Sequence, residues 1–343
     1  MYGQLFDWGL KNGGMVAFEI DFMDYMYQLL QFPVLLSTVG LAEQWQVGIG
    51  SAAAARNLSV QLCMEVPAEL MTTLLSDSIT NARGSGDGGS NVAGFAASSL
   101  LMSALGISPF TDNFFSLGKS AQLRTALAIL SRGPVGFGDA VGKFNASLLK
   151  RTCTADGKLL QPSEVAVQLD SPGYCADTCH SLVTSTESRI DAGDAPTLYG
   201  TLMTFSAQAG EKFPSSQVRL AELTALPSSG QDYVYMYFKL DDPACVAGGD
   251  ASGCLRPIDA AHPAQLVDTD SSGLAVFLVA PVMPQGWVLL GEASKLVPIS
   301  EDRISLLTGQ SAPGGGLSVN IVGAARKKVE LLAAKGSGKI MAF

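Results

Sequence analysis

The sequence predicts a mixed α/β fold, in which a β/α barrel of the TIM type is followed by an all-β antiparallel sandwich. Up to about residue 155, strand-like and helical segments alternate, which is the pattern of a parallel sheet with helical crossovers. From about residue 165, short β-type runs are separated by Gly, Pro, Ser and Asp clusters, which is typical of a sandwich. We therefore expect a barrel part at residues 1–160 and a sandwich domain at residues 161–343.

The first part contains five strand-like segments, which are rich in apolar residues and end at turn residues. The clearest one follows the pair Gly13-Gly14, which is typical of a helix stop, and its near-continuous apolar run predicts a strand buried on both faces. The expected strands lie at residues 15–23, 58–66, 78–83, 107–115 and 133–139. The expected helices lie at residues 2–11, 41–56, 92–105, 121–130 and 147–153.

The second part consists of short β-type runs with no internal repeat of fixed period. Val, Leu, Ile and aromatic residues dominate each run, and turn residues separate one run from the next. The expected strands lie at residues 165–169, 197–205, 218–223, 232–240, 273–280, 286–292, 303–307, 317–322 and 328–334.

Composition and charge exclude several classes of function. The chain is 47% hydrophobic and 15% charged, which describes a compact globular protein rather than a disordered one. Its net charge of -9 argues against a nucleic-acid partner, because binding to phosphates needs a basic surface. The two histidines, His180 and His262, are too few for most His-dependent triads and metal sites. Carboxylate chemistry on a neutral or weakly polar ligand remains, and we expect neither a metal nor an organic cofactor.

The cysteines leave two interpretations open. Cys245 and Cys254 bracket a short loop, and Cys175 lies close to Cys179, so an oxidising compartment would give two disulfides and a reducing one free thiols. A zinc site at Cys175, Cys179 and His180 is the weaker interpretation, because no second cluster supplies the remaining ligands.

Signals for the compartment are mixed. Sequons begin at Asn57 and Asn145, although Asn145 would equally cap the helix that follows it. Together with disulfides they favour a secreted, vacuolar or lysosomal protein, but the first residues lack the basic region and apolar core of a signal peptide. The uncharged run at residues 91–110 contains serines and Pro109, which favour a buried helix followed by a turn over a membrane span.

Two familiar motifs are dismissed. Gly84, Gly86 and Gly89 fit a G-x-G-x-x-G pattern, but Asp87 within it would repel a pyrophosphate. A serine nucleophile elbow is missing, because no serine has glycines two residues away on both sides.

The stronger pattern is a pair of acids at the ends of two separate strands. Asp21 ends the strand in FEIDF, where an ionised carboxylate must be either paired or used in chemistry. Asp87 follows the strand that ends at Arg83. Retaining glycosidases need two carboxyl groups about 5 Å apart, and neighbouring barrel strands present such pairs at their carboxyl ends. The alternative is a structural Asp21 and a plain ion pair between Arg83 and Asp87 on a flexible surface loop.

These residues resemble motifs of the α-galactosidase and raffinose-synthase group, glycoside hydrolase family 36 and its clan relatives. Residues 19–21, Glu-Ile-Asp, stand where the clan's fourth barrel strand ends in K-x-D, and Arg83 with Asp87 matches R-x-x-x-D of the sixth strand. Residues 63–65, Cys-Met-Glu, resemble the end of the fifth strand.

The resemblance extends along the first part of the chain. SPFTDNFF, which contains Asp112, is similar to the group, and GPVGFGD, which ends at Asp139, resembles the last strand of the raffinose-synthase branch. The resemblance implies that the chain contains strands 4 to 8 of the barrel, followed by the family's C-terminal β domain. Since three strands would then be missing, we expect either a truncated gene model or a second copy or another chain that completes the barrel. An open apolar edge strand would otherwise promote aggregation.

The resemblance also implies roles for individual residues. Asp21 would be the nucleophile and Asp87 the general acid and then base. Glu19 replaces a sugar-binding Lys of the clan, which leaves the sugar specificity open, and its charge would raise the pKa of one acid of the Glu19/Asp21 pair. The residues that would line the sugar pocket are Glu19, Cys63, Glu65, Arg83, Asp112 and Asp139.

The sequence therefore predicts a retaining α-glycosidase-like hydrolase of the α-galactosidase type, which acts on a carbohydrate substrate. The first alternative is a transglycosylase of the raffinose-synthase kind, which delivers the sugar to an acceptor alcohol. The second alternative is a catalytically inactive sugar-binding homologue or a fragment. A homo-oligomer is among the expected states, because another copy is one way to complete the barrel.

Overall fold

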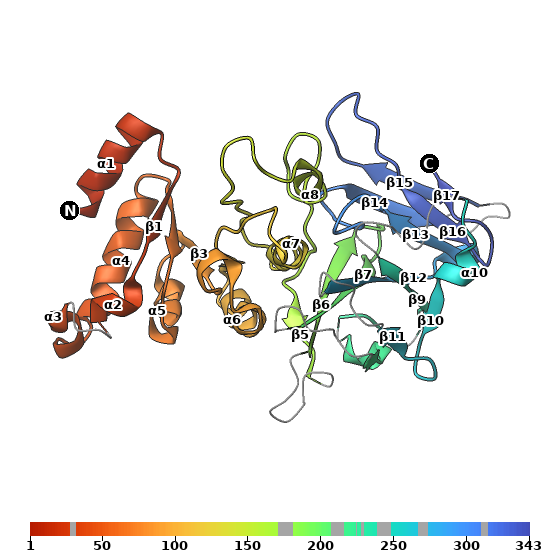
Figure 1. Ribbon diagram of the computed structural model, residues 1–343, viewed down its shortest axis with the longest axis horizontal. Coiled ribbons are helices and arrows are strands. Elements are labelled where there is room, and N and C mark those ends of the chain that lie inside the picture. The colour runs from red at the N-terminus through yellow and green to blue at the C-terminus, as the bar shows by residue number, and fades with distance from the viewer. Residues whose placement is uncertain are drawn as a thin grey trace.

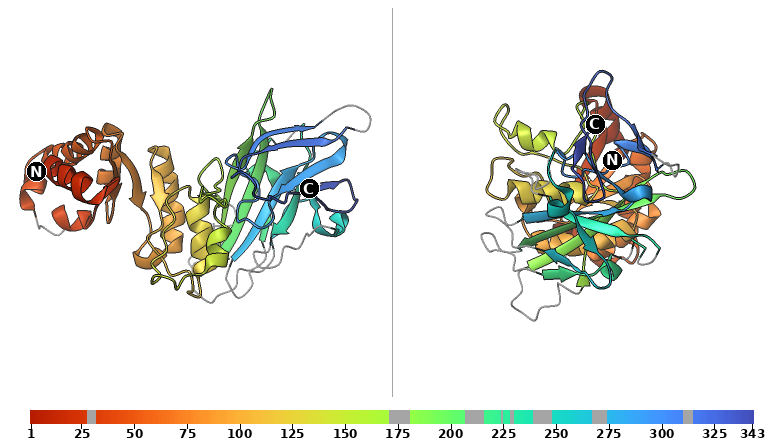
Figure 2. Two further views of the ribbon diagram at one scale, coloured as in Figure 1. Left: turned by 90° about the horizontal axis from the view of Figure 1, so that it is seen from above. Right: turned by 90° about the vertical axis from the view of Figure 1, so that its right-hand side faces the viewer.

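The computed structural model describes most of the chain. The described residues are 1–27, 32–170, 181–206, 216–223, 225–227, 230–238, 248–266, 274–309 and 315–343. The molecule is elongated: a parallel sheet with its helices lies toward the N-terminus, and antiparallel sheets lie toward the C-terminus (Figures 1 and 2). The predicted sequence of a mixed α/β part followed by antiparallel β-structure is confirmed.

Four parallel strands form the first sheet, in the order in which they occur in the chain. Each strand therefore pairs with the next one, which is the winding of a β/α barrel, whereas a doubly wound sheet reverses its order. The strands are β1 (Ala17–Ile20), β2 (Ser59–Leu62), β3 (Ile79–Arg83) and β4 (Ser108–Phe110).

The fifth predicted strand, at residues 133–139, is only partly present. A single parallel bridge joins Phe137 to Phe114, supported by a bond from the Gly138 N–H to the Phe114 carbonyl of 3.0 Å. Three glycines and Pro134 lie in this segment, and both residue types weaken a strand. The prediction of a full strand there is wrong for this reason.

Helices connect the strands of the parallel sheet. Helix α1 ends at Gly14, whose φ of 60° gives the left-handed C-cap that glycine favours. Asn145 caps α8 by accepting a bond from the Leu148 N–H, so its predicted capping role is confirmed. The helices of this part are α1 (Tyr2–Gly13), α2 (Met23–Tyr27), α3 (Pro33–Ser37), α4 (Leu41–Ala54), α5 (Pro67–Thr72), η1 (Thr73–Leu75), η2 (Asp87–Gly89), α6 (Val92–Ala104), α7 (Ala121–Leu130) and α8 (Ala146–Lys150).

One face of the parallel sheet is buried against helices. Alternate residues of the strands point to this face, because side chains in a strand alternate between its two faces. The core there includes Phe6, Ile20, Ile49, Ala53, Val60, Leu62, Ile79, Ala82 and Met102. The opposite face carries the polar residues of the strands and is described with the candidate site.

The main antiparallel sheet has the strand order β10-β9-β12-β7-β6-β5. Its strands are β5 (Val167–Gln168), β6 (Ser181–Ile190), β7 (Thr197–Ser206), β9 (Tyr233–Phe238), β10 (Arg256–Ile258) and β12 (Leu274–Pro281). The expected strand at residues 218–223 is wrong in kind, because β8 (Ser216–Val218) stops there and the short helix η3 (Leu220–Glu222) follows. β8 pairs with β11 (Ala264–Leu266).

Two smaller sheets complete the C-terminal part. They contain β13 (Trp287–Gly291) with β16 (Leu332–Lys335) and β17 (Met341–Ala342), and β14 (Ile304–Gly309) with β15 (Leu317–Ile321). The short helices α10 (Ala251–Cys254) and η4 (Pro284–Gly286) lie among them. Buried residues of α6 and α7 belong to the same hydrophobic core as these sheets, so the two parts of the chain pack together.

A buried ion pair lies within the C-terminal part, and Lys295 near it makes bonds across the junction with the first part. Arg303 Nε lies 2.8 Å from Glu292 Oε2, and both residues are buried. The Lys295 ammonium donates to the carbonyls of Lys150 and Cys153 at 2.7 Å each. These bonds tie the segment after α8 to the C-terminal sheets.

Candidate functional site at the carboxyl edge of the parallel sheet

A row of polar residues crosses the exposed face of the parallel sheet. The strand register places Glu19 beside Gln61, Gln61 beside Asn81 and Asn81 beside Ser108, and we call these four the floor row. The Gln61 amide donates to Glu19 Oε1 at 2.9 Å, and the Asn81 amide donates to Gln61 Oε1. The register shifts between Val60 and Gln61, which leaves Thr80 unpaired as a bulge and turns Asn81 to the same face.

A second row lies one step closer to the carboxyl edge, and we call it the edge row. It contains Asp21, Cys63, Arg83 and Phe110, because Ile20 pairs with Leu62, Leu62 with Ala82, and Arg83 with Phe110. Adjacent strands are about 4.8 Å apart, so the backbones at Asp21 and Arg83 are separated by about 10 Å, with Cys63 between them.

Arg83 links this row to the loops beyond the strands. Its Nη1 lies 2.9 Å from Asp87 Oδ1 and 3.5 Å from Asp112 Oδ2. Asp112 also accepts bonds from the N–H groups of Gly88, at 2.8 Å, and Asn113, at 2.7 Å. The Arg83 side chain is 12% exposed and that of Asp87 is 93% exposed. The structure therefore forms the ion pair that the sequence left as the alternative role of Arg83, and it adds Asp112 as a second partner.

Glu65 contributes a carboxyl group that titrates near neutral pH. Its pKa is raised to about 7, chiefly by burial; its own backbone N–H and the charge of Arg83 lower the pKa, and the nearby charge of Glu69 raises it. Its Oε2 is buried and has no hydrogen-bond partner among the described atoms. A carboxyl group with this pKa can give or take a proton under physiological conditions.

Cys63 is a free, buried thiol between Asp21 and Arg83. Its pKa is raised far above the usual range, first by burial and then by a hydrogen bond to Asp21, whereas the charge of Arg83 lowers it. The thiol is therefore neutral at physiological pH and is a hydrogen-bond donor rather than a nucleophile. Glu19 and Asp21 are both exposed.

Asp139 makes a separate contact, which involves none of the other predicted site residues. Its Oδ2 accepts a bond of 2.8 Å from the Ser116 N–H, within the loops that the bridge from Phe114 to Phe137 brings together. This contact has a structural purpose, and a place for Asp139 in a sugar pocket stays a prediction.

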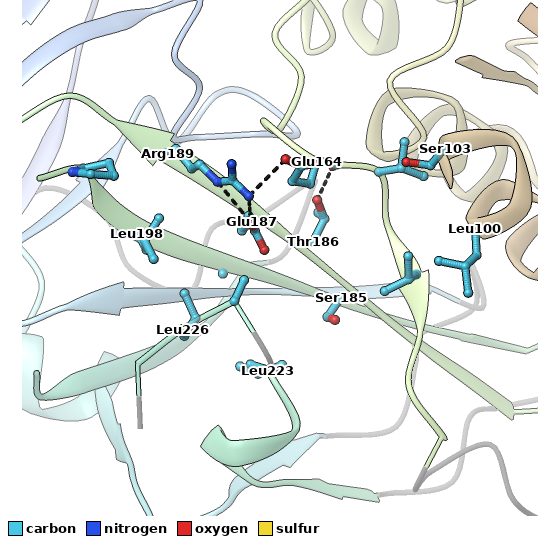
Figure 3. A pocket seen from close by; sticks show the side chains of 15 residues that line it. Leu100, Ser103, Glu164, Ser185, Thr186, Glu187, Arg189, Leu198, Leu223 and Leu226 are labelled. Atoms are coloured by element: carbon cyan, nitrogen blue, oxygen red, sulfur yellow. Dashed lines mark hydrogen bonds and ion pairs between the residues drawn. The ribbon is translucent and has the colours of Figure 1, made fainter. Parts of the chain in front are cut away.

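A separate cavity of about 710 Å³ lies between α6 and the strands β6 and β7 (Figure 3). Leu198, Leu223 and Leu226 form an apolar side, and Arg189 Nη2 joins Glu187, at 2.6 Å, to Glu164, at 3.0 Å. The sequence pattern marked none of the lining residues as a site, because they come from five separate segments. Both carboxylates of this cavity, those of Glu164 and Glu187, pair with Arg189.

The remaining predictions concern cysteines, metals and membranes. Cys254 is disulfide-bonded, and its predicted partner Cys245 lies outside the described residues, as do Cys175, Cys179 and His180. Within the described ranges, no group of three or more His, Cys, Asp or Glu side chains is arranged to hold a metal ion. In the same part of the chain, no helix combines the length and apolar character needed to cross a membrane.

Comparison with solved structures gives a distant likeness. The chain matches no protein-family model, and no curated protein matches it. Among solved structures it is similar to the crystal structure of a GH30 endoxylanase from Clostridium papyrosolvens C71, with a TM-score of 0.38 and 11% sequence identity. That similarity covers 81% of this chain and 70% of the endoxylanase chain. The likeness concerns only the path of the backbone, and it assigns no activity to this chain.

Proposed function

We propose that the chain is a retaining glycosidase of the α-galactosidase type, with Asp21 as the nucleophile and Asp87 as the general acid and then base. The observation that supports this best is the edge row, which places Asp21 on the same sheet face as Arg83, the direct partner of Asp87. Two carboxylates on different strands at one carboxyl edge are what a retaining mechanism requires.

In this proposal a carboxylate oxygen of Asp21 attacks the anomeric carbon and forms an ester bond. The bond from that carbon to the glycosidic oxygen breaks, and the carboxylic acid of Asp87 gives its proton to the departing oxygen. In the second half, the Asp87 carboxylate takes a proton from water as the water oxygen bonds to the anomeric carbon. The ester bond breaks, which returns Asp21 as a carboxylate and Asp87 as an acid.

The other predicted residues would hold the sugar. Arg83 and Asp112 lie where they can bond to hydroxyl groups beside Asp87. Gln61 and Asn81 orient the Glu19 carboxylate as an acceptor, because each amide already donates along the floor row. The proposed lining of the sugar pocket is Glu19, Cys63, Glu65, Arg83, Asp112 and Asp139.

The proposal includes a barrel with more strands than the described chain contains. The four strands and the segment around Phe137 would be strands 4 to 8 of a (β/α)8 barrel. Their sequential order supports this, because an eight-stranded barrel is wound in that way. Polypeptide outside these 343 residues, or a second chain, would supply the remaining strands beside β1.

Replacing Asp21 with Asn tests the proposal. The D21N variant removes the nucleophilic oxygen but keeps the side-chain shape, so hydrolysis of an aryl α-galactoside should fall on the order of 10³-fold or more. Glu43→Gln is the matched control, since Glu43 is an exposed acid on α4 and should keep full activity. Full activity of D21N would overturn the proposal. Product analysis with a disaccharide acceptor separates hydrolysis from transfer.

One observation favours a second candidate, a sugar-binding protein without turnover. General acids commonly keep their proton at neutral pH because burial raises their pKa. The Asp87 side chain, in contrast, is 93% exposed and bonded to Arg83. Binding of galactose or a galactoside by the wild-type chain, with no hydrolysis or transfer, would favour this candidate.

A further inference from the structure

Two matched turns follow β1 and β2 at the carboxyl edge. Phe22 comes directly after Asp21 and has a φ of 57°, and Met64 comes directly after Cys63 and has a φ of 58°. Left-handed backbone is costly for bulky side chains, and such residues gather at sites where the fold must aim a neighbouring group. The same unusual turn thus follows both Asp21 and Cys63.

Backbone hydrogen bonds hold the two turns together. The Cys63 N–H donates to the Ile20 carbonyl at 2.9 Å, and the Asp24 N–H donates to the Met64 carbonyl at 2.9 Å. Asp21 and Cys63 are therefore fixed as neighbours on the same sheet face, independently of their side-chain conformations. Their adjacency follows from the register, as β1 and β2 pair without a shift.

The side chain of Asp21 has a backbone donor and a thiol neighbour in this arrangement. Its Oδ1 accepts a bond of 2.8 Å from the Phe22 N–H, which the left-handed turn directs back toward the carboxylate. The Cys63 thiol is buried at the end of the neighbouring strand. The register and the paired turns thus place a neutral donor group next to the carboxylate.

We propose that Cys63 is a positioning residue for the nucleophile Asp21, held beside it by the paired turns. This rests on the proposed function. A thiol suits the role, because it is a weak, neutral donor that orients the carboxylate without the strong attraction of a cation, so Asp21 stays reactive. After the ester forms, the same S–H group can remain bonded to the carboxyl oxygen that did not attack.

The first experiment needs no turnover. The S–H stretching band of the full chain is recorded by infrared spectroscopy for wild type, D21N and Cys63→Ser, and the band that C63S removes is assigned to Cys63. Cys153→Ser assigns the band of the other thiol that is free among the described residues, which donates to the Leu149 carbonyl and serves as an internal reference. We expect the Cys63 band to lie at lower frequency than that of Cys153 and to rise in D21N. An unchanged band in D21N overturns the proposal.

The second experiment measures the chemical step. An activated 5-fluoro-α-galactosyl fluoride traps the glycosyl-enzyme, and the rate constant for its formation is compared for wild type, C63A and C63S. Removing a donor to a charged acceptor should slow trapping about 10- to 100-fold in C63A, and C63S, which keeps a donor, should restore most of the rate. A hydrogen bond from the thiol would favour the ionised form of the Asp21 carboxylate. Loss of this bond in C63A should therefore move the acidic limb of the pH profile for trapping to higher pH.

The outcomes separate the two proposals. If C63A forms the glycosyl-enzyme at the wild-type rate and with the wild-type pH profile, the role proposed for Cys63 is overturned. Asp21 then remains the proposed nucleophile. A wild-type chain that forms no adduct would count against the proposed function, and the S–H band would still decide whether Cys63 holds Asp21. A loss in C63A that C63S does not restore, with an unchanged pH profile, would indicate a packing effect and would also overturn the proposal.

Discussion

At the scale of single residues, burial decides which carboxyl group of the site keeps its proton. Glu65 lies just beyond the end of β2, and burial raises its pKa from 4.5 to about 7. Arg83 opposes this shift without cancelling it, because its Nη1 is already directed at Asp87 and Asp112. The edge thus combines two acids that pair with Arg83 and one buried acid, Glu65, whose pKa lies near 7.

The raised pKa of Glu65 predicts a particular pH dependence of stability. The folded chain binds this proton up to about pH 7, whereas the unfolded chain releases it near pH 4.5, so the contribution to stability falls as the pH rises between these values. The change is at most about 3 kcal/mol. Glu65→Gln should remove it, and urea unfolding at pH 5 and pH 8 measures the difference. Equal pH dependence in wild type and E65Q would contradict this account.

The motif spacing allowed part of the site to be predicted from the sequence. Arg83 and Asp87 are close in the chain, so their contact needs only a short loop. The edge row is different, because its register depends on the bulge at Thr80, which no sequence pattern marked. The adjacency of Cys63 and Asp21 depends instead on the register of β1 and β2, which no sequence pattern marked either.

At the scale of elements, apolar runs predicted β1 to β4, and composition explains where prediction failed. The run at residues 133–139 is too rich in glycine to sustain a strand. β6 was missed because Ser, Thr and charged residues fill much of it, although its pairing with β7 extends over ten residues. Its stability comes from tertiary pairing rather than from local sequence.

The buried ion pair of the C-terminal part gives a prediction at the same scale. Arg303→Ala leaves Glu292 buried without its 2.8 Å partner and also removes the bond to the Val322 carbonyl, at 2.6 Å. Loss of one member of a buried ion pair costs about 3–5 kcal/mol, and urea unfolding should show this. Arg189→Ala is the control, since Arg189 pairs in a half-exposed setting and its loss should cost about 1 kcal/mol or less. Equal costs for the two variants would contradict the importance of this buried ion pair.

At the scale of the whole molecule, the parallel sheet and its helices lie toward one end of an elongated body (Figure 2). Helices and a hydrophobic core cover the other face, so the floor and edge rows are where a ligand can meet the sheet. The fold alone suits many activities, and the proposed chemistry therefore depends on Asp21.

Mass spectrometry of the trapped intermediate tests that dependence most directly. After treatment of the full chain with a 5-fluoro-α-galactosyl fluoride and digestion, the account predicts that the peptide containing Asp21 gains the mass of one fluorosugar, and that D21N gains none. A fluorosugar on another carboxylate, or an adduct of equal yield in D21N, would contradict the assignment of Asp21 as the nucleophile.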